Sequence, residues 1–404
     1  MRAILFLLLA LLPASGVFAR DPILPAYVVA DGESGLILDS SQASQPRHPA
    51  SLAKLMTLYL TFQSVSKSQT QWDAQVTVSA RAASQGGSVL GLKTGETITV
   101  EEAAMAVITR SANDAAMALA EYLGGSESAF AARMTEQADR LGLKSTRFKN
   151  ATGLSADGQV TTAADMAGLA LALRRHFPSD YARFASKAMS WKKQQLPNLN
   201  GFLGAFQGAE GLKTGFTCPA GYNLVAAASQ GGRRLVGVVL GARSKDERES
   251  LMAKFLSRAF KGVVPKAQAA VETALQKSAP DLSNVVCAGG YVPGEPSAFT
   301  GDSWNYPAGW ALELSFGRSP GKVQQELAAA QSRLGLSGRR LVVRAPFSGD
   351  IRYRGLLGGL SEEAAVKACL DYRAKGGDCL VLNPLMLKGA FEEQKRLARF
   401  AARD

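Results

Sequence analysis

The chain has 404 residues, 47% of them hydrophobic, which is enough for two domains with apolar cores. It carries 46 basic and 34 acidic residues, a formal net charge of +12 at pH 7. Two histidines, His48 and His176, argue against a zinc site of three or four ligands and against a Ser-His-Asp triad. Four cysteines are too few for a disulfide-rich scaffold.

The first residues have the pattern of a cleaved secretory signal. Arg2 precedes an apolar run over 4–12, and small residues follow at Val17 and Ala19. The apolar run is well short of the roughly 20 residues that a membrane-spanning helix needs. We therefore expect residues 1–19 to be a signal peptide cleaved after Ala19, and the mature protein to be exported.

The excess of basic residues has two interpretations. An exported protein meets no nucleic acid, so the charge indicates attraction to an anionic envelope surface or to carboxylate-rich polymers. A generally basic and soluble surface explains the same charge. In neither case does the sequence predict a nucleic-acid partner.

Residues 25–262 are predicted to mix helices with strands. Alternating and apolar runs indicate strands, and two pairs of them are close enough to form hairpins. Helices that surround an antiparallel sheet make this an α+β domain. The helices are expected over 50–66, 100–123, 162–175 and 244–260, and the strands over 26–30, 36–39, 222–228 and 234–240.

The remainder of the chain divides into three parts. Residues 263–305 are rich in Ala, Pro, Gly and Ser and indicate a linker with a few short ordered pieces. Residues 306–386 show the order β-α-β-β-α-β of a small ferredoxin-like domain. Residues 387–404 form a tail, for which a solvated helix is expected and peripheral contact with a membrane is the alternative.

Ser51-Leu52-Ala53-Lys54 lies where the chain enters the first predicted helix. Residues at i and i+3 share a helix face, so the Lys54 amine can reach the Ser51 hydroxyl, and the helix N-terminus favours a developing alkoxide. Lysine acts as a base only where burial or another cation lowers its pKa. The same pattern recurs at Ser64–Lys67 and Ser190–Lys193, which we expect on the solvated surface, so the motif alone is weak.

Ser111-Ala112-Asn113 interrupts the alanine-rich helical stretch. One interpretation is a cap that joins two helices, with Ser111 or Asn113 bonding backbone amides. In the other, Ser111 relays a proton and Asn113 binds a peptide substrate. Ser303-Trp304-Asn305 matches the same short pattern, so this motif is also weak alone.

Lys213-Thr214-Gly215 stands immediately before the second predicted hairpin. Lysine and threonine that point into a cleft from an edge strand can bind a terminal carboxylate. Glycine allows a substrate backbone to approach closely. Lys93-Thr94-Gly95 duplicates the motif, but it is predicted to form a turn before 96–99 and to have no catalytic role.

Each motif alone is weak, but together they are specific, because they occur in one order along the chain. The first lies at a helix start, the second in a loop between helices and the third at a strand edge. Such a set is known from class A β-lactamases and penicillin-binding proteins. Residues 25–262 resemble the low-molecular-weight penicillin-binding proteins, the serine-type D-alanyl-D-alanine carboxypeptidases. Further matches are Arg47-His48-Pro49-Ala50, Asn150-Ala151-Thr152-Gly153-Leu154, Thr161-Thr162-Ala163, Asn198-Leu199-Asn200 and Ala220-Gly221-Tyr222.

The resemblance implies a serine β-lactamase/penicillin-binding-protein-like transpeptidase fold and a role for each motif. Ser51 would attack the carbonyl between two D-alanines with Lys54 as base, and water would hydrolyse the acyl-enzyme without metal or cofactor. The catalytic set is Ser51, Lys54 and Ser111. The substrate-binding set is Asn113, Lys213, Thr214, Gly215, Phe216 and Arg248, with the amides of Ser51 and Phe216 as oxyanion hole. Arg248 has the alternative of a solvated helix residue.

Residues 306–386 resemble a SPOR domain, the module that binds peptidoglycan glycan strands stripped of their stem peptides. The resemblance rests on topology, Trp310, Tyr353-Arg354-Gly355 and the pair Cys369 and Cys379. We expect this unit to fold alone and to contribute nothing to bond cleavage. Because an exported protein is in an oxidising compartment, we expect a Cys369–Cys379 disulfide, with two buried free thiols as the alternative.

The sequence thus predicts a periplasmic carboxypeptidase that removes the terminal D-alanine from stem pentapeptides and is inhibited covalently by β-lactam antibiotics. A D,D-endopeptidase or a β-lactamase using the same site, or a decayed envelope-binding protein, are the alternatives. Between 150 and 175 the acidic residues are Asp157 and Asp165. Neither clearly offers the glutamate with which class A β-lactamases deacylate quickly, so penicillin should remain attached.

Overall fold

We describe the protein from a computed structural model. The described residues are 25–263, 279–282, 286, 309–317, 319–347, 350–375, 377, 379–382 and 384. The predicted signal peptide, most of the predicted linker and the tail over 387–404 lie outside them. Within the described part of the chain, no helix is both long and apolar enough to cross a membrane.

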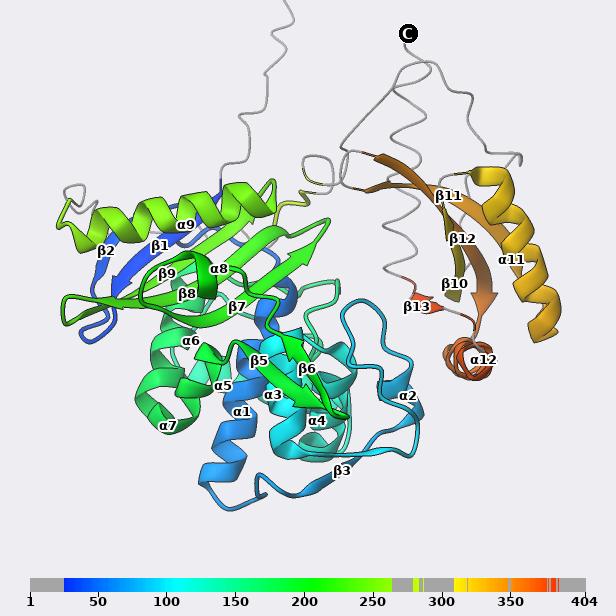
Figure 1. Ribbon diagram of the computed structural model, residues 1–404, viewed down its shortest axis with the longest axis horizontal. Helices are drawn as coiled ribbons and strands as arrows, with labels where there is room; N and C mark the ends of the chain where they lie inside the picture. The colour runs from blue at the N-terminus through cyan, green and yellow to red at the C-terminus, as the bar shows by residue number, and fades with distance from the viewer. Residues whose placement is uncertain are drawn as a thin grey trace, which may run out of the picture.

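A five-stranded antiparallel sheet forms one layer of the N-terminal domain, which we define as β1 to α9 (Figure 1). Its strand order is β2-β1-β9-β8-β7, so that β7 lies at an edge. Both predicted hairpins are confirmed. The strands are β1 (Ala26–Asp31), β2 (Ile37–Ser41), β7 (Ala209–Thr217), β8 (Gly221–Gln230) and β9 (Arg233–Ala242).

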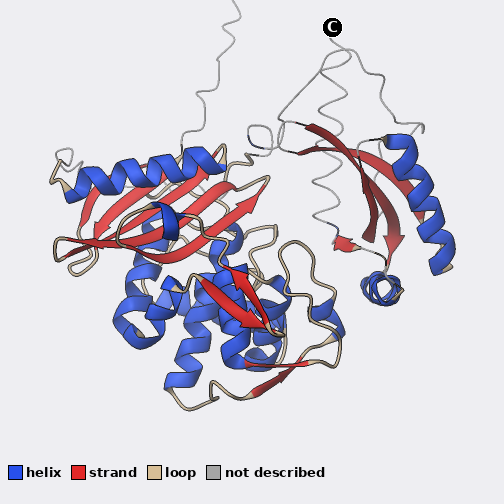
Figure 2. Ribbon diagram, in the orientation of Figure 1, coloured by secondary structure: helices blue, strands red, loops and turns tan. Residues whose placement is uncertain are grey.

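Strands β8 and β9 are apolar nearly throughout because both faces of the sheet are covered. On β8, Leu224 and Ala226 belong to the core beneath α9 (Lys245–Phe260). The alternate residues Val225 and Ala227 belong to the larger core of the helical layer. Side chains alternate between the two faces of a strand, so one short run supplies both cores. Figure 2 shows α9 on the outer face of the sheet and the other long helices of the domain beneath it.

The helical layer surrounds the buried helix α1 (Figure 1). The predicted helix over 50–66 begins as a 3₁₀ turn before continuing as α1. Polar caps fix the starts of several helices, as at Thr99, where a capping box with Glu102 satisfies the first amides of α3. The helices are η1 (Ala50–Ala53), α1 (Lys54–Ser66), α2 (Ala80–Ala83), α3 (Val100–Arg110), α4 (Asn113–Gly124), α5 (Glu127–Arg140), α6 (Ala163–His176), α7 (Pro178–Tyr181), η2 (Ala182–Ala185) and α8 (Phe202–Ala205).

Two small hairpins complete this layer. They pair antiparallel and lie apart from the large sheet. Their strands are β3 (Gln75–Thr77), β4 (Thr97–Thr99), β5 (Ala188–Trp191) and β6 (Gln194–Pro197).

A four-stranded antiparallel sheet organises the C-terminal unit, which we define as β10 to β13. Its strand order is β11-β12-β10-β13, and both helices pack on one face, where Leu312 and Leu327 share a core. The predicted disulfide between Cys369 and Cys379 is confirmed, and Cys218 is also disulfide-bonded. The elements are β10 (Trp310–Gly317), α11 (Pro320–Leu334), β11 (Arg339–Phe347), β12 (Asp350–Leu360), α12 (Glu362–Ala374) and β13 (Leu380–Leu382).

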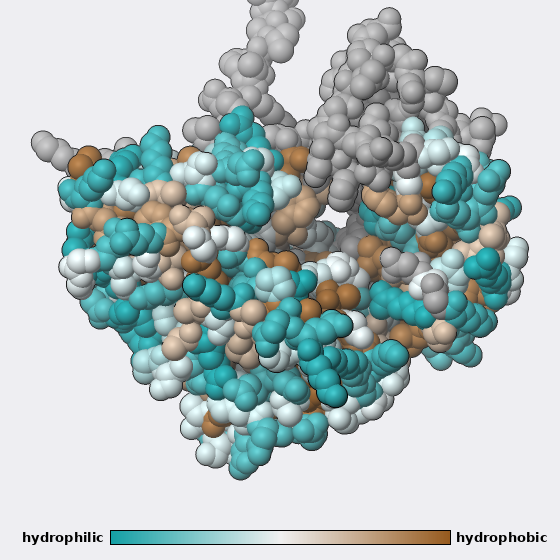
Figure 3. Space-filling model, in the orientation of Figure 1, coloured by the Kyte–Doolittle hydropathy of each residue, from teal (hydrophilic) through white to brown (hydrophobic). Residues whose placement is uncertain are grey.

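The C-terminal unit touches the N-terminal domain, where the sequence led us to expect two units without a shared core. Leu370 of α12 packs against the main core of the N-terminal domain. A fragment of the predicted linker also packs there, since Leu282 is buried and its amide donates to the Pro219 carbonyl at 3.0 Å. Figure 3 shows a mostly hydrophilic face with hydrophobic residues gathered around the hollow between the two parts.

Candidate active site

Ser51 lies in the 3₁₀ turn that leads into α1. Its predecessor Ala50 has φ of +48°, a left-handed conformation that is rare for residues with a side chain. Gly153 packs against this turn so tightly that a Cβ atom there would come within 1.9 Å of the Ala50 carbonyl oxygen. A segment that is distant in the sequence therefore packs against the turn that carries Ser51.

Lys54 is fully buried one helical turn after Ser51. Its Nζ lies 3.0 Å from Ser51 Oγ, 2.6 Å from Asn113 Oδ1 and 2.5 Å from the Thr152 carbonyl oxygen. Burial lowers the pKa of Lys54 well below its ordinary value, the positive charge of Lys213 lowers it further, and Asp114 opposes both. The amine is thus brought to the serine in an environment that favours its neutral form.

Ser111 and Asn113 occupy the break between α3 and α4. Ser111 ends α3 in a left-handed conformation with φ of +55°, and Asn113 is the first residue of α4. The Asn113 amide donates from Nδ2 to the Gly86 carbonyl at 2.6 Å, while its Oδ1 faces Lys54. The N-cap of α4 is Ala112, with no side-chain cap bond. The interpretation of Asn113 as a helix cap is therefore wrong for this structure.

The loop that supplies the Gly86 carbonyl is itself fixed by the residue after Asn113. The buried carboxylate of Asp114 accepts from the amides of Leu90, Gly91 and Leu92 at 2.8–3.0 Å. The first turn of α4 therefore places the Asn113 amide beside Lys54 and the Asp114 carboxylate against the loop over 90–92.

Lys213 enters the site from β7, the predicted strand edge. Its side chain is buried, and Nζ donates to the Thr214 carbonyl at 3.0 Å. Burial, and then the charge of Arg248, lower the pKa of Lys213 to about 7. Gly215 packs closely against the turn that carries Ser51, since a Cβ there would lie 3.1 Å from the Ser51 amide nitrogen.

The last two predicted residues differ in their surroundings. Phe216 is 43% exposed, with its ring 4.3 Å from that of Tyr222. Arg248 is buried and pairs with Glu249 at 2.9 Å, so the alternative of a solvated helix residue is wrong. Its burial lowers its pKa, and its charge acts on Lys213. Arg248 is therefore close enough to Lys213 for its charge to affect that residue.

The duplicate motifs lie elsewhere. Lys93 is exposed in the turn that precedes β4, as predicted, and Ser190 is exposed on β5. Ser64 was expected on the solvated surface, but it is buried because it lies on an inward face of α1. Among the described residues, the hydrogen-bond partners of Lys54 are Ser51, Asn113 and Thr152, and no duplicate motif contributes one.

Asn223 supports the site and was missed by sequence reasoning. This fully buried residue of β8 donates from Nδ2 to the carbonyl oxygens of His48 and Pro49 at 3.0 and 3.1 Å, and its Oδ1 accepts from the Gly241 amide at 2.8 Å. It ties the sheet to the segment that carries Ser51. An asparagine in the middle of an apolar strand was the available signal, because a buried amide needs partners.

Known proteins share the sequence and the fold of the N-terminal domain. The D-alanyl-D-alanine carboxypeptidase DacC of Escherichia coli (strain K12) is 39% identical over 243 residues, which cover 58% of this chain and 61% of that relative. The structure of DacD from Francisella tularensis matches at a TM-score of 0.58 and 32% identity, over 60% of this chain and 71% of that chain. Penicillin-binding protein D2 from Listeria monocytogenes, in its ampicillin-bound form, matches at a TM-score of 0.51 and 33% identity, over 58% of this chain and 96% of that chain.

The N-terminal domain therefore has the transpeptidase fold of penicillin-binding proteins, as a mixed α+β domain. The family of D-alanyl-D-alanine carboxypeptidases matches residues 24–244, which is more than half of the chain. The chain belongs to this family. It spans about 61% of the length of the curated relative described above, and the matched region ends before the C-terminal unit.

Proposed function

We propose that this protein is a serine-type D-alanyl-D-alanine carboxypeptidase that removes the terminal D-alanine from stem pentapeptides of peptidoglycan. The observation that carries the proposal is the set of oxygens around Lys54 Nζ, supplied by Ser51, Asn113 and Thr152. Two of these oxygens are carbonyls, which can only accept hydrogen bonds.

A neutral lysine amine fits this set in one way. It has two N–H bonds, which donate to the carbonyl oxygens of Asn113 and Thr152. The lone pair is then left for the third neighbour, the Ser51 hydroxyl at 3.0 Å, which would donate its proton to the neutral amine. Because burial already disfavours the charged amine, Lys54 is suited to act as the general base.

The reaction then proceeds through an ester on Ser51. The Oγ atom bonds to the carbonyl carbon between the two D-alanines while its proton passes to Lys54. The C–N bond breaks, and the departing D-alanine amine takes a proton by way of Ser111. Water hydrolyses the ester and regenerates the serine. The backbone amides of Ser51 and Phe216 would stabilise the oxyanion, and Gly215 leaves room for it.

The terminal carboxylate of the substrate would bind at the edge of β7. Thr214 offers a hydroxyl, and Lys213 and Arg248 offer buried positive charge. Two buried cations close together are unfavourable without an anion, which is the reason that the charge of Arg248 lowers the pKa of Lys213. A bound carboxylate relieves this repulsion, and the remaining N–H of Asn113 is available to the substrate peptide.

β-Lactam antibiotics would acylate the same serine. The Listeria relative has been solved with ampicillin bound. Asp165 is not placed to activate water for rapid deacylation, since its carboxylate accepts hydrogen bonds from the Ser145 amide and the Thr146 hydroxyl. The acyl-enzyme should therefore persist, which argues against a β-lactamase.

Mass spectrometry of muropeptides with pentapeptide stems tests the cleaved bond. Incubation with the purified protein should convert pentapeptide to tetrapeptide stems and release D-alanine. Cleavage of cross-links between stems without loss of terminal D-alanine would instead identify an endopeptidase. A protein that leaves both substrates unchanged but still binds sacculi would fit the decayed envelope-binding alternative.

We further propose that the C-terminal unit is a ferredoxin-like SPOR domain that binds glycan strands in the periplasm. The order β-α-β-β-α-β and the sheet order β11-β12-β10-β13 support this assignment. Tyr353 is buried and Arg354 pairs with Glu313, so both support the fold more directly than they offer a glycan contact. Co-sedimentation of the protein with sacculi stripped of stem peptides tests the proposal, and intact sacculi should retain less protein.

A further inference from the structure

A cavity of about 360 Å³ lies where the end of α6, α7 and η2 meet the strands β7 and β9. Figure 1 shows α6 and α7 beneath the large sheet. Pro178, Ala182 and Ala185 give the cavity an apolar wall of small side chains. Cavities of this size hold small molecules in many proteins. The residues that line it include none of those assigned to the candidate active site, so the two sites are separate.

Two of the charged residues that line the cavity are paired with each other. The Arg234 guanidinium donates to both carboxylate oxygens of Glu210 at 2.8–3.1 Å. The Ser229 hydroxyl donates to the same carboxylate at 2.5 Å. Because both oxygens of Glu210 already accept hydrogen bonds, this pair forms a fixed part of the wall.

Two further polar groups of the wall are buried without a hydrogen-bond partner. Tyr181 is 6% exposed, and no described residue forms a hydrogen bond with its hydroxyl. The Nε–H group of Arg174 also has no acceptor among the described residues, although another nitrogen of this guanidinium pairs with Glu33. Buried polar groups normally have partners, so two such groups in one cavity require an explanation.

The Tyr181 hydroxyl lies among the charged groups of the cavity. Burial, and then the charge of Glu210, raise the pKa of Tyr181, while the charges of Arg234 and Arg174 lower it. The phenol therefore keeps its proton at neutral pH and can donate it in a hydrogen bond. The Nε–H group of Arg174 can only donate. The wall thus offers two unpaired donors, and a ligand that satisfies both must carry acceptors.

We propose that this cavity is a second binding site, for a small carboxylate with an apolar body. The two oxygens of a carboxylate would accept from the Tyr181 hydroxyl and from Arg174 Nε–H. Pro178, Ala182 and Ala185 would contact the apolar body. A bound carboxylate would satisfy two donors that the fold leaves unpaired.

The charge of Arg174 favours an anion over a neutral ligand. Its described ion pair is with Glu33, whose side chain is 67% exposed and which also pairs with Arg234 at 3.3 Å. An exposed carboxylate shared by two arginines is hydrated and stabilises each of them only weakly. A carboxylate inside the cavity is screened less, so it can compete with Glu33 for Arg174. Weakening the Glu33 pair should therefore strengthen binding of the ligand.

Benzoate is a suitable probe, and benzamide is its uncharged counterpart of similar shape. Isothermal titration calorimetry with the full-length protein measures the Kd of each compound. Tyr181→Phe removes the hydroxyl, and its control is Tyr122→Phe, which changes a tyrosine outside the cavity. Arg174→Lys keeps the charge and removes the Nε–H group. Its control is Arg140→Lys, which is also in the last turn of a helix and paired with a glutamate. Lys213→Ala shows whether benzoate binds at the candidate active site instead.

Tyr181→Phe and Arg174→Lys should each raise the Kd of benzoate about tenfold, the scale of one lost hydrogen bond to a charged group. Benzamide should bind the wild-type protein at least about tenfold more weakly than benzoate, for the same reason. Glu33→Gln should lower the Kd of benzoate about twofold to fivefold, the scale of an exposed ion pair. The two controls and Lys213→Ala should stay within about twofold of the wild-type Kd.

Thermal unfolding without ligand separates binding from a structural role of Tyr181. Because its hydroxyl has no partner in the fold, Tyr181→Phe should unfold at or above the wild-type Tm. A lower Tm would show that the fold itself uses this hydroxyl, which would overturn the proposal. Undetectable binding of benzoate, equal affinity for benzamide, or an unchanged Kd in both Tyr181→Phe and Arg174→Lys would also overturn it. So would a loss of binding in Lys213→Ala as large as that in Arg174→Lys.

Discussion

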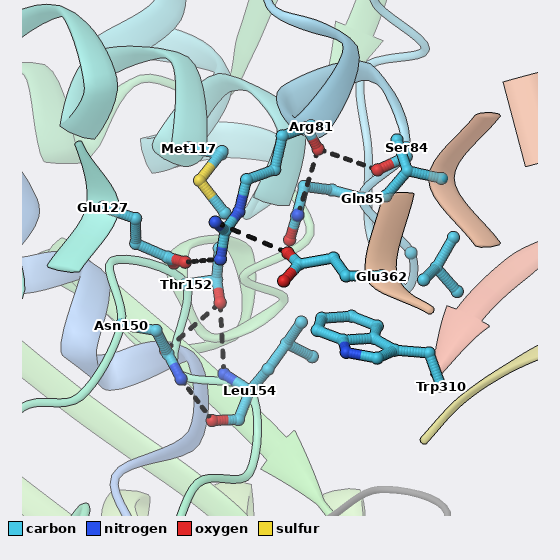
Figure 4. A pocket seen from close by; sticks show the side chains of 13 residues that line it. Arg81, Ser84, Gln85, Met117, Glu127, Asn150, Thr152, Leu154, Trp310 and Glu362 are labelled. Atoms are coloured by element: carbon cyan, nitrogen blue, oxygen red, sulfur yellow. Dashed lines mark hydrogen bonds and ion pairs between the residues drawn. The ribbon is translucent and has the colours of Figure 1, made fainter. Parts of the chain in front are cut away.

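Lys54 Nζ lies 2.5 Å from the backbone carbonyl oxygen of Thr152, a residue 98 positions further along the chain. A buried amine without acceptors would carry a large desolvation cost, and this carbonyl removes part of it. The same contact orients the amine toward Ser51. Thr152 also lines a cavity between the N-terminal domain and the C-terminal unit (Figure 4).

Ser51 should be the residue acylated by penicillin. Intact-mass analysis of the wild-type protein should show one added penicilloyl group, and Ser51→Ala should show none. The physical reason is that Ser51 alone among the serines of the repeated Ser-x-x-Lys patterns has a described contact with a buried lysine amine. Ser190→Ala, at an exposed duplicate, serves as control. Labelling that persists in Ser51→Ala would contradict the assignment.

Lys213→Ala should reduce carboxypeptidase turnover by at least about a hundredfold, the scale for loss of one preorganised polar or charged partner. Lys213 is buried at the strand edge beside Arg248, whereas Lys93 of the duplicate motif is exposed in a turn. Lys93→Ala is therefore the matched control and should keep wild-type kinetics. Similar losses in the two variants would show that the strand-edge argument is mistaken.

The stability of the protein should rise with pH because of Lys213. Its pKa is lowered to about 7 in the folded protein from an ordinary value of 10.5. Between these values the unfolded chain binds the proton that the folded protein lacks, so raising the pH favours folding. Lys54 contributes in the same direction. Urea unfolding of wild type and Lys213→Met, at about pH 7 and about pH 9.5, measures the difference.

The wild-type protein should gain more stability over this interval than Lys213→Met does. Lys93→Met, which changes an exposed lysine, should behave as wild type. An identical pH dependence in wild type and Lys213→Met would show that Lys213 is not held neutral by the fold.

Asn223→Leu should destabilise the fold and loosen the turn that carries Ser51. The change leaves the Gly241 amide without its acceptor and removes the bonds to His48 and Pro49. Unsatisfied buried groups of this kind cost about 1–3 kcal/mol of unfolding free energy. Denaturant unfolding should show this loss, and penicillin acylation should slow because the turn before Ser51 is no longer tied to β8. Lost stability with an unchanged acylation rate would restrict Asn223 to a structural role.

The sequence by itself determined the local features. Apolar runs on either side of a Gly-rich turn predicted the strands β8 and β9, and the spacing of Ser51 and Lys54 predicted that their side chains meet. These features depend on near neighbours in the chain. The Cys369–Cys379 disulfide was predictable for a similar reason, since both cysteines belong to one small unit.

Only the tertiary structure decided how the site is supported and what adjoins it. The pKa of Lys54 depends on burial by distant segments, and two of its partners, Asn113 and Thr152, lie far away in the sequence. Every residue has a backbone carbonyl, so no pattern of residue types distinguishes the one at Thr152. The burial of Arg248 and the docking of Trp310 likewise arise from packing between elements whose relative placement no local pattern encodes.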